Sequence, residues 1–91
     1  MRSEGINVLN NSNVKEQVIE IIARVLELKR DEVTDELSIG DVPKWDSIGN
    51  MAILTTLESE LGIDFPADDL FEMTSVQSIL SEIEKLVGSN V

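Results

Sequence analysis

The stretch DSIGNMAILTTLESELG, residues 46–62, predicts the central helix of the protein and both of its ends. The Asp46 side chain can accept hydrogen bonds from the free amides of a helix that begins at Ser47. Gly62 is of the residue type that most often ends a helix. One helical face carries the apolar residues Ile48, Met51, Leu54, Leu57 and Leu61. Ile53 lies off that stripe, which indicates a second apolar contact, either with a neighbouring element or with a bound chain.

The segment before this helix divides into another helix and a long loop. Asn13 is a favoured capping residue, and apolar residues follow it at helical spacing to about Lys29: Val14, Val18, Ile21, Ile22, Val25 and Leu26. From residue 30 to residue 46 this period breaks, and glycine, proline and several acids appear. The loop still contains isolated apolar residues (Val33, Leu37, Ile39 and Val42). We therefore expect it to be ordered and packed on the helices, with one short helical turn near Leu37.

The segment after the central helix predicts two more helices. Pro66 is suited to the first turn of a short helix that continues over residues 67–71. Thr74 and Gln77 have the spacing of a capping box at the start of the last helix, which Gly88 closes. Its apolar residues are Val76, Ile79, Leu80, Ile83, Leu86 and Val87. The predicted fold is an all-α, small four-helix bundle with three main helices, one short helix and a long first loop.

Length and composition predict one domain. The chain has 91 residues, 42% of them hydrophobic, which is enough for one core and too little for a second. We expect a single domain over residues 1–91, with a core at about 14–87 and a flexible N-terminal extension at 1–12. No signal peptide and no membrane-spanning run is recognised in the sequence. These observations favour a cytoplasmic monomer without stable membrane insertion.

The residue types that are missing exclude several classes of function. The chain contains neither cysteine nor histidine, which removes disulfides, thiolate metal sites and the Ser-His and Cys-His nucleophile systems. The acidic loop residues Asp31, Asp35, Glu36 and Asp41 lack the glycine and the final glutamate of a calcium-binding loop. We therefore predict neither a catalytic residue nor a dedicated metal site, and the protein is not expected to be an enzyme.

The charge pattern indicates the class of partner. The formal net charge is -11, which disfavours binding to nucleic acid or to anionic membranes. Between residues 45 and 84 there are acidic side chains and no basic one. This half of the chain is suited to basic partner surfaces, although an excess of carboxylates also serves solubility alone.

The segment from Trp45 to Gly49 carries the most specific candidate site. Ser47 places a hydroxyl at the first position of a helix, where free amides and the helix dipole favour a phosphate group. The alternative is that Asp46 and Ser47 only cap the helix. Gly49 lowers helix stability by about 1 kcal/mol relative to Ala, so we expect either a mobile helix front or close approach of a partner. Trp45 is expected to pack on the bundle.

Three stretches together resemble the acyl carrier and peptidyl carrier family of phosphopantetheine-binding proteins, from about residue 14 to residue 87. Asp46-Ser47-Ile48 is similar to the family's Asp-Ser-Leu attachment motif. LESELGI, residues 57–63, resembles the end of its second helix, and Thr74-Ser75-Val76 resembles the start of its last helix. The resemblance implies that the Ser47 hydroxyl attacks the pyrophosphate of coenzyme A on a magnesium-dependent phosphopantetheinyl transferase.

By this resemblance the protein presents acyl or related intermediates as thioesters on 4'-phosphopantetheine attached to Ser47. Asp46 would cap the helix and support docking of the transferase. The other implied partners are acyl-loading and acyl-processing enzymes with basic docking surfaces. Fatty-acid-synthesis members usually have acids where this chain has Gly49, Asn50 and Ala52, so a specialised biosynthetic pathway is expected. The alternative from another class is an unmodified acidic helical protein-interaction module.

Overall fold

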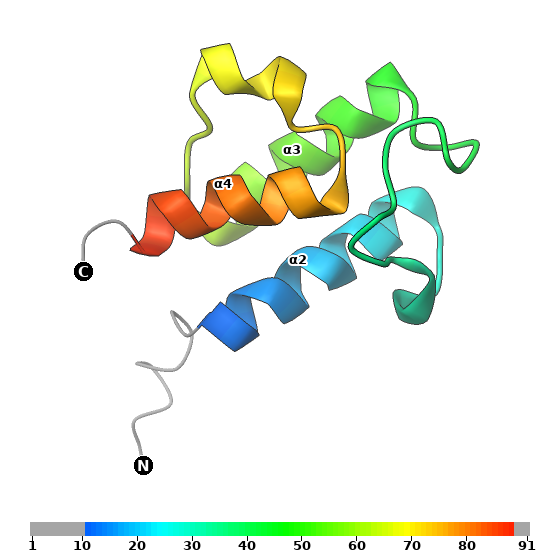
Figure 1. Ribbon diagram of the computed structural model, residues 1–91, viewed down its shortest axis with the longest axis horizontal. Coiled ribbons are helices and arrows are strands. Elements are labelled where there is room, and N and C mark those ends of the chain that lie inside the picture. Colours follow the sequence, from blue (N-terminus) through cyan, green and yellow to red (C-terminus); the bar gives the residue numbers. More distant parts are fainter. Residues whose placement is uncertain (1–10, 89–91) are drawn as a thin grey trace.

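The computed structural model describes the backbone of residues 11–88 and the side chains of residues 14–86. Its elements are α2 (Asn11–Leu26), the 3-10 helix η1 (Arg30–Glu32), α3 (Ser47–Leu61), the 3-10 helix η2 (Ala67–Glu72) and α4 (Val76–Gly88). In Figure 1, α2 runs opposite to α4, and η2 joins α3 to α4 along the upper edge. The predicted all-α class is confirmed: the described residues form three long helices, the short η2 between α3 and α4, and a long first loop that contains η1.

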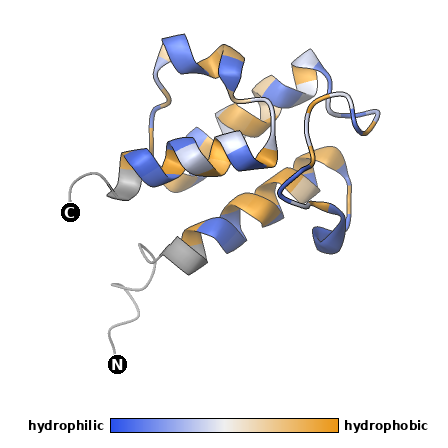
Figure 2. Ribbon diagram, viewed as in Figure 1, coloured by the Kyte–Doolittle hydropathy of each residue, from blue (hydrophilic) through white to orange (hydrophobic). Residues whose placement is uncertain are grey.

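Apolar residues from all three long helices meet in a single core. The helices turn their apolar faces toward one another, which the orange segments of Figure 2 show. Helix α2 contributes Val14, Val18, Ile21, Ile22, Ala23 and Leu26; α3 contributes Ile53, Leu54 and Leu57; α4 contributes Val76, Ile79 and Ile83. The connecting segments add Val33, Trp45, Phe65 and Met73. Within the described part of the chain, no helix is long and apolar enough to cross a membrane.

The ends of the first long helix differ from the prediction. Helix α2 begins at Asn11, so Asn13 lies inside the helix rather than at its cap. Residue type alone leaves such a boundary uncertain by one or two positions. The expected flexible extension, residues 1–12, lies outside the described residues apart from its last two positions, which are helical. The helix ends at Leu26, before Lys29, because Glu27 adopts a left-handed conformation with φ 60°.

The long loop between α2 and α3 is attached to the bundle, as expected. The Ile39 amide donates to the Thr74 carbonyl at 2.8 Å, and the Val76 amide donates to the Leu37 carbonyl at 2.9 Å. These bonds surround an isolated antiparallel bridge between Ser38 and Ser75. The loop therefore pairs with the segment that leads into α4, and this pairing fixes the position of the loop on the bundle.

The single helical turn of this loop lies earlier than predicted. It is η1, at Arg30–Glu32, whereas Leu37 ends a tight turn in which its amide donates to the Thr34 carbonyl at 3.1 Å. The Arg30 guanidinium donates to the Glu16 carboxylate on α2. This hydrogen bond, with the nearby positive charge, lowers the pKa of Glu16 from its ordinary value.

The caps after α3 are shifted by one residue. Ser75 and Ser78, not Thr74 and Gln77, form the reciprocal cap of α4: the Ser78 amide donates to Ser75 Oγ and the Ser75 amide to Ser78 Oγ, both at 3.0 Å. The Thr74 carbonyl is already used by the loop, so the helix starts later. Pro66 precedes the first turn of η2 with φ -59° and ψ 136° rather than lying within it.

Candidate functional site

Ser47 is the first residue of α3, and its side chain is exposed. Asp46 is the N-cap in extended conformation, with φ -112° and ψ -166°. Its Oδ1 atom accepts a hydrogen bond from the Gly49 amide at 2.8 Å. At the other end of the helix, Gly62 is left-handed with φ 68°. The predicted start, cap and end of this helix are confirmed, and the hydroxyl stands at the positive end of a 15-residue helix.

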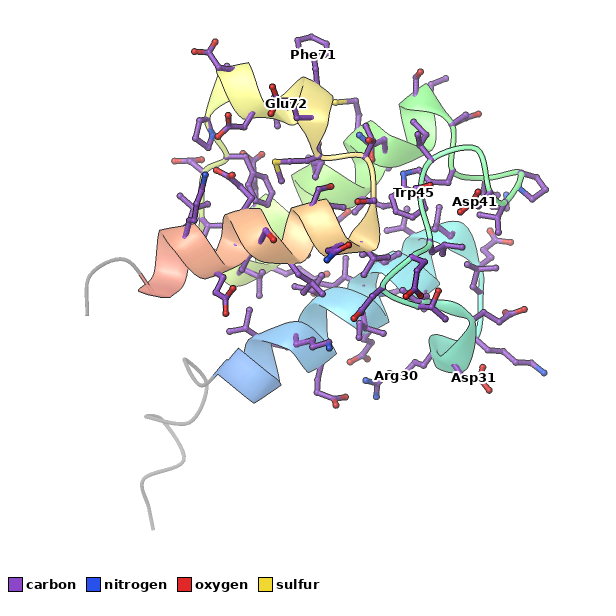
Figure 3. All side chains as sticks on the ribbon, in the orientation of Figure 1. Arg30, Asp31, Asp41, Trp45, Phe71 and Glu72 are labelled. Atoms are coloured by element: carbon purple, nitrogen blue, oxygen red, sulfur yellow. The ribbon has the colours of Figure 1, made fainter. Side chains whose placement is uncertain are left out.

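A buried hydrogen bond fixes the chain on both sides of Ser47. Trp45 is 0% exposed, as expected for a packed residue, and Figure 3 shows it between the loop and the helices. Its indole Nε1 donates to Asn50 Oδ1 at 2.8 Å. The Asn50 amide donates to the Asp46 carbonyl, also at 2.8 Å. Asn50 thus connects the residue before the cap with the first turn of the helix.

Sequence reasoning missed Asn50 as part of the site. It registered the residue only as an uncharged replacement for an acid, whereas the structure buries it to 6% exposure. A buried tryptophan almost always needs an acceptor for its indole N–H. The one available signal was a polar residue five positions after Trp45, inside a stretch expected to be helical.

Gly49 is required by the chain's own loop. A Cβ atom at this position would lie 2.0 Å from the Lys44 carbonyl oxygen, far inside any observed contact. The loop itself is held there by bonds from the Gly40 amide to the Trp45 carbonyl at 2.8 Å and from the Trp45 amide to the Val42 carbonyl at 3.1 Å. A close approach at Gly49 therefore occurs within the chain itself, whereas the mobile helix front and the approaching partner stay predictions.

The predicted apolar stripe of α3 enters the core only in its later part: Leu54 and Leu57 are buried and Leu61 packs partly buried against the core. The buried residues are Asn50, Ile53, Leu54 and Leu57, so the helix is rotated from the stripe that begins at Ile48. Ile53, for which two contacts were considered, is fully buried in the core. Ile48 is 81% exposed and Met51 is 49% exposed. The rotation satisfies Trp45 and leaves two large apolar side chains beside Ser47.

Two of the acidic loop residues that were considered for a calcium site have structural partners. Asp41 accepts a hydrogen bond from the Ser38 amide at 2.9 Å, and Asp35 pairs with Lys15 at 3.9 Å. Among the residues whose side chains are described, no three of the ligand types His, Cys, Asp and Glu gather where they could hold a metal ion. The site offers a hydroxyl and helix amides rather than a catalytic pair.

Two comparisons with known proteins identify relatives of this chain. A family described as "Phosphopantetheine attachment site" matches residues 16–83, a span that contains Ser47 and everything that positions it. The acyl carrier protein of Thermosynechococcus vestitus is 27% identical over 81 residues, covering 89% of this chain and 100% of that protein.

Proposed function

Because the chain belongs to the phosphopantetheine attachment site family of carrier proteins, we propose that Ser47 is the residue that holds its prosthetic group. The function is that of an acyl carrier protein with 4'-phosphopantetheine, and such proteins are carriers rather than enzymes. What supports Ser47 in particular is its place: an exposed hydroxyl at the first position of α3, directly after the Asp46 cap.

The surroundings of Ser47 fit a phosphodiester. The Asp46 carboxylate accepts a hydrogen bond from the Gly49 amide, and the Asp46 backbone carbonyl accepts one from the Asn50 amide. Among the described residues, no acceptor binds the amides of Ser47 and Ile48, and these two donors point out of the helix end. A phosphate on Ser47 Oγ would add its negative charge where the amides and the helix dipole stabilise it. The hydrogen bond between Trp45 and Asn50 would hold the start of α3, and with it Ser47, in place.

The prosthetic group also agrees with the composition of the chain. The sequence contains no cysteine, so the protein itself has no thiol on which a thioester could form. The bound group supplies that thiol, and partner enzymes supply the catalysis. The residues of the carrier need only present the hydroxyl, stabilise the phosphate charge and offer a surface for docking.

We further propose service in a specialised pathway rather than in general fatty acid synthesis. From Ser47 to Leu57, α3 carries no charged side chain, which removes ionic contacts at the helix front. Exposed acids remain on η2 at Asp68 and Glu72, suited to acyl-loading and acyl-processing enzymes with basic surfaces. The monomeric state, the single domain over residues 1–91 and the cytoplasmic location stay predictions.

The direct experiment is modification by a broad-specificity phosphopantetheinyl transferase with coenzyme A and magnesium, followed by intact mass measurement. The wild type and Ser59→Ala, which removes another exposed serine of α3, should gain the mass of one phosphopantetheine. Ser47→Ala should gain none. If the folded wild type also gains none, with a cognate transferase tested, the protein is better explained as an unmodified acidic interaction module.

A further inference from the structure

Lys44 is the only basic residue in residues 31–84, and it comes three residues before Ser47. Its backbone carbonyl oxygen lies against the first turn of α3, because a Cβ atom on Gly49 would be 2.0 Å from that oxygen. The next residue, Trp45, is fully buried, whereas Lys44 itself is exposed. Lys44 therefore has its backbone held at the start of the helix that carries Ser47, and its ammonium group lies in water.

The partner that Lys44 has in the unmodified protein is weakly bound. Its Nζ atom lies 3.7 Å from the carboxylate of Glu27, the residue that follows α2. Figure 1 shows the end of α2 and the loop that leads into α3 on the same side of the bundle. The side chains of Lys44 and Glu27 are 54% and 71% exposed, and ion pairs as exposed as this one contribute little to the free energy of folding. Lys44 can therefore exchange Glu27 for another anion at small cost.

Modification of Ser47 would bring two negative charges together at the start of α3. The Asp46 carboxylate is one, and the phosphodiester on Ser47 would be the other. In residues 42–57 the only charged side chains are those of Lys44 and Asp46, so α3 has no cation of its own near its first turn. The free amides at the helix start offset part of the added charge. Lys44 is the side chain of this stretch whose charge has the sign to offset the rest.

We propose that Lys44 is the counter-ion of the phosphate group on Ser47: in the modified protein its ammonium leaves Glu27 and pairs with the phosphodiester. The inference rests on the proposed attachment at Ser47. Three residues of fully extended chain span at most about 11 Å, and here the chain folds back against Gly49, so the long lysine side chain and the phosphate are within reach of each other. Charge-assisted hydrogen bonds from an ammonium to phosphate oxygens are among the stronger ones in proteins. Lys44 would thus orient the base of the phosphopantetheine arm.

The test is phosphorus NMR of the modified protein, prepared with coenzyme A, magnesium and a phosphopantetheinyl transferase. Lys44→Gln should shift the phosphodiester signal, whereas Lys29→Gln, which removes the same charge from another exposed lysine of the first loop, should leave it in place. High salt should move the wild-type signal toward that of Lys44→Gln, because ions screen an exposed pair. Lys44→Arg keeps the charge and should retain this salt dependence.

Thermal unfolding of the unmodified and modified forms gives a second measurement. Lys44→Gln should lower the melting temperature of the modified form by about 2–4 °C more than that of the unmodified form, the scale of one exposed ion pair in a domain of this size. Lys29→Gln should change both forms equally.

The outcomes separate this inference from the proposed function. If the folded wild type gains no phosphopantetheine, or gains it at a residue other than Ser47, the proposed function fails and the role of Lys44 fails with it. If Ser47 is modified but Lys44→Gln has the phosphorus signal, the salt dependence and the melting difference of the wild type, the counter-ion is refuted while attachment at Ser47 stands.

Discussion

Replacing Gly49 with alanine sets two opposing effects against each other at the start of α3. Alanine is the best helix former, and intrinsic propensity alone predicts a gain of about 1 kcal/mol in the free energy of unfolding. The new Cβ atom, however, would lie 2.0 Å from the Lys44 carbonyl oxygen. That oxygen belongs to the backbone, so no side-chain rotation can relieve the overlap.

The size of the required movement decides which effect is larger. Real Cβ atoms essentially never approach another heavy atom closer than 3.0 Å, so the loop or the helix must shift by roughly 1 Å, and overpacking of this kind costs about 1–3 kcal/mol. The loop at Lys44 leads into buried Trp45, which resists the shift. Because the blocking atom is backbone, we expect the cost to lie in the upper part of this range, about 2–3 kcal/mol. After the propensity gain of about 1 kcal/mol is subtracted, Gly49→Ala should lower the free energy of unfolding by about 1–2 kcal/mol net. For a domain of this size, the melting temperature should fall by about 5 °C or more.

The assay is urea unfolding followed by far-UV circular dichroism, with Trp45 fluorescence as a local probe. Ala52→Gly is the matched control, because residue 52 is exposed on the same helix and reports the propensity effect alone, a loss of about 1 kcal/mol. A Gly49→Ala variant as stable as the wild type, or more stable, would refute the reasoning. It would mean that the loop at Lys44 moves away at little cost in free energy and that Gly49 has another role.

Three further changes test other parts of the structure. Asn50→Ala leaves the buried indole N–H of Trp45 without its acceptor and should cost about 1–3 kcal/mol in urea unfolding; in a double-mutant cycle with Trp45→Phe the two losses should be less than additive, and strict additivity would contradict the contact. Glu27→Gly relieves a left-handed residue with φ 60° and should raise stability by about 1 kcal/mol, visible as a higher melting temperature; no increase would argue against strain there. Ser75→Ala should lose about 1 kcal/mol and Thr74→Ala much less, because Ser75 supplies the cap of α4, and the reverse order would restore the predicted Thr74 cap.

The features that sequence could predict are those set by strong local signals. Asp46 and Gly62 bound α3 because a carboxylate cap and a left-handed glycine each satisfy helix-end groups within a few residues. The all-α fold follows from apolar residues at helical spacing in three separate segments. The exposed position of Ser47 follows from the same helix boundary, so the candidate site could be predicted from the sequence.

What could not be predicted depends on contacts between segments. Local periodicity predicted Leu54, Leu57 and Leu61 on the inner face of α3, but it also included Ile48 and Met51, which are exposed, and it missed Asn50, which is buried with its hydrogen bond to Trp45. The cap of α4 moved from Thr74 to Ser75 because the Thr74 carbonyl accepts a hydrogen bond from the first loop. Gly49 was interpreted through propensity, since its neighbour Lys44 comes close only once the loop is folded back.

The attachment of phosphopantetheine at Ser47 is tested most directly by locating the modification within the chain. The protein is incubated with coenzyme A, magnesium and a cognate transferase, and its fragments are sequenced by tandem mass spectrometry. We predict that the added mass lies on Ser47, within the fragment that also contains Trp45 and Asp46. A modified protein whose added mass lies on any other hydroxyl, or a folded protein that acquires none, would contradict this assignment.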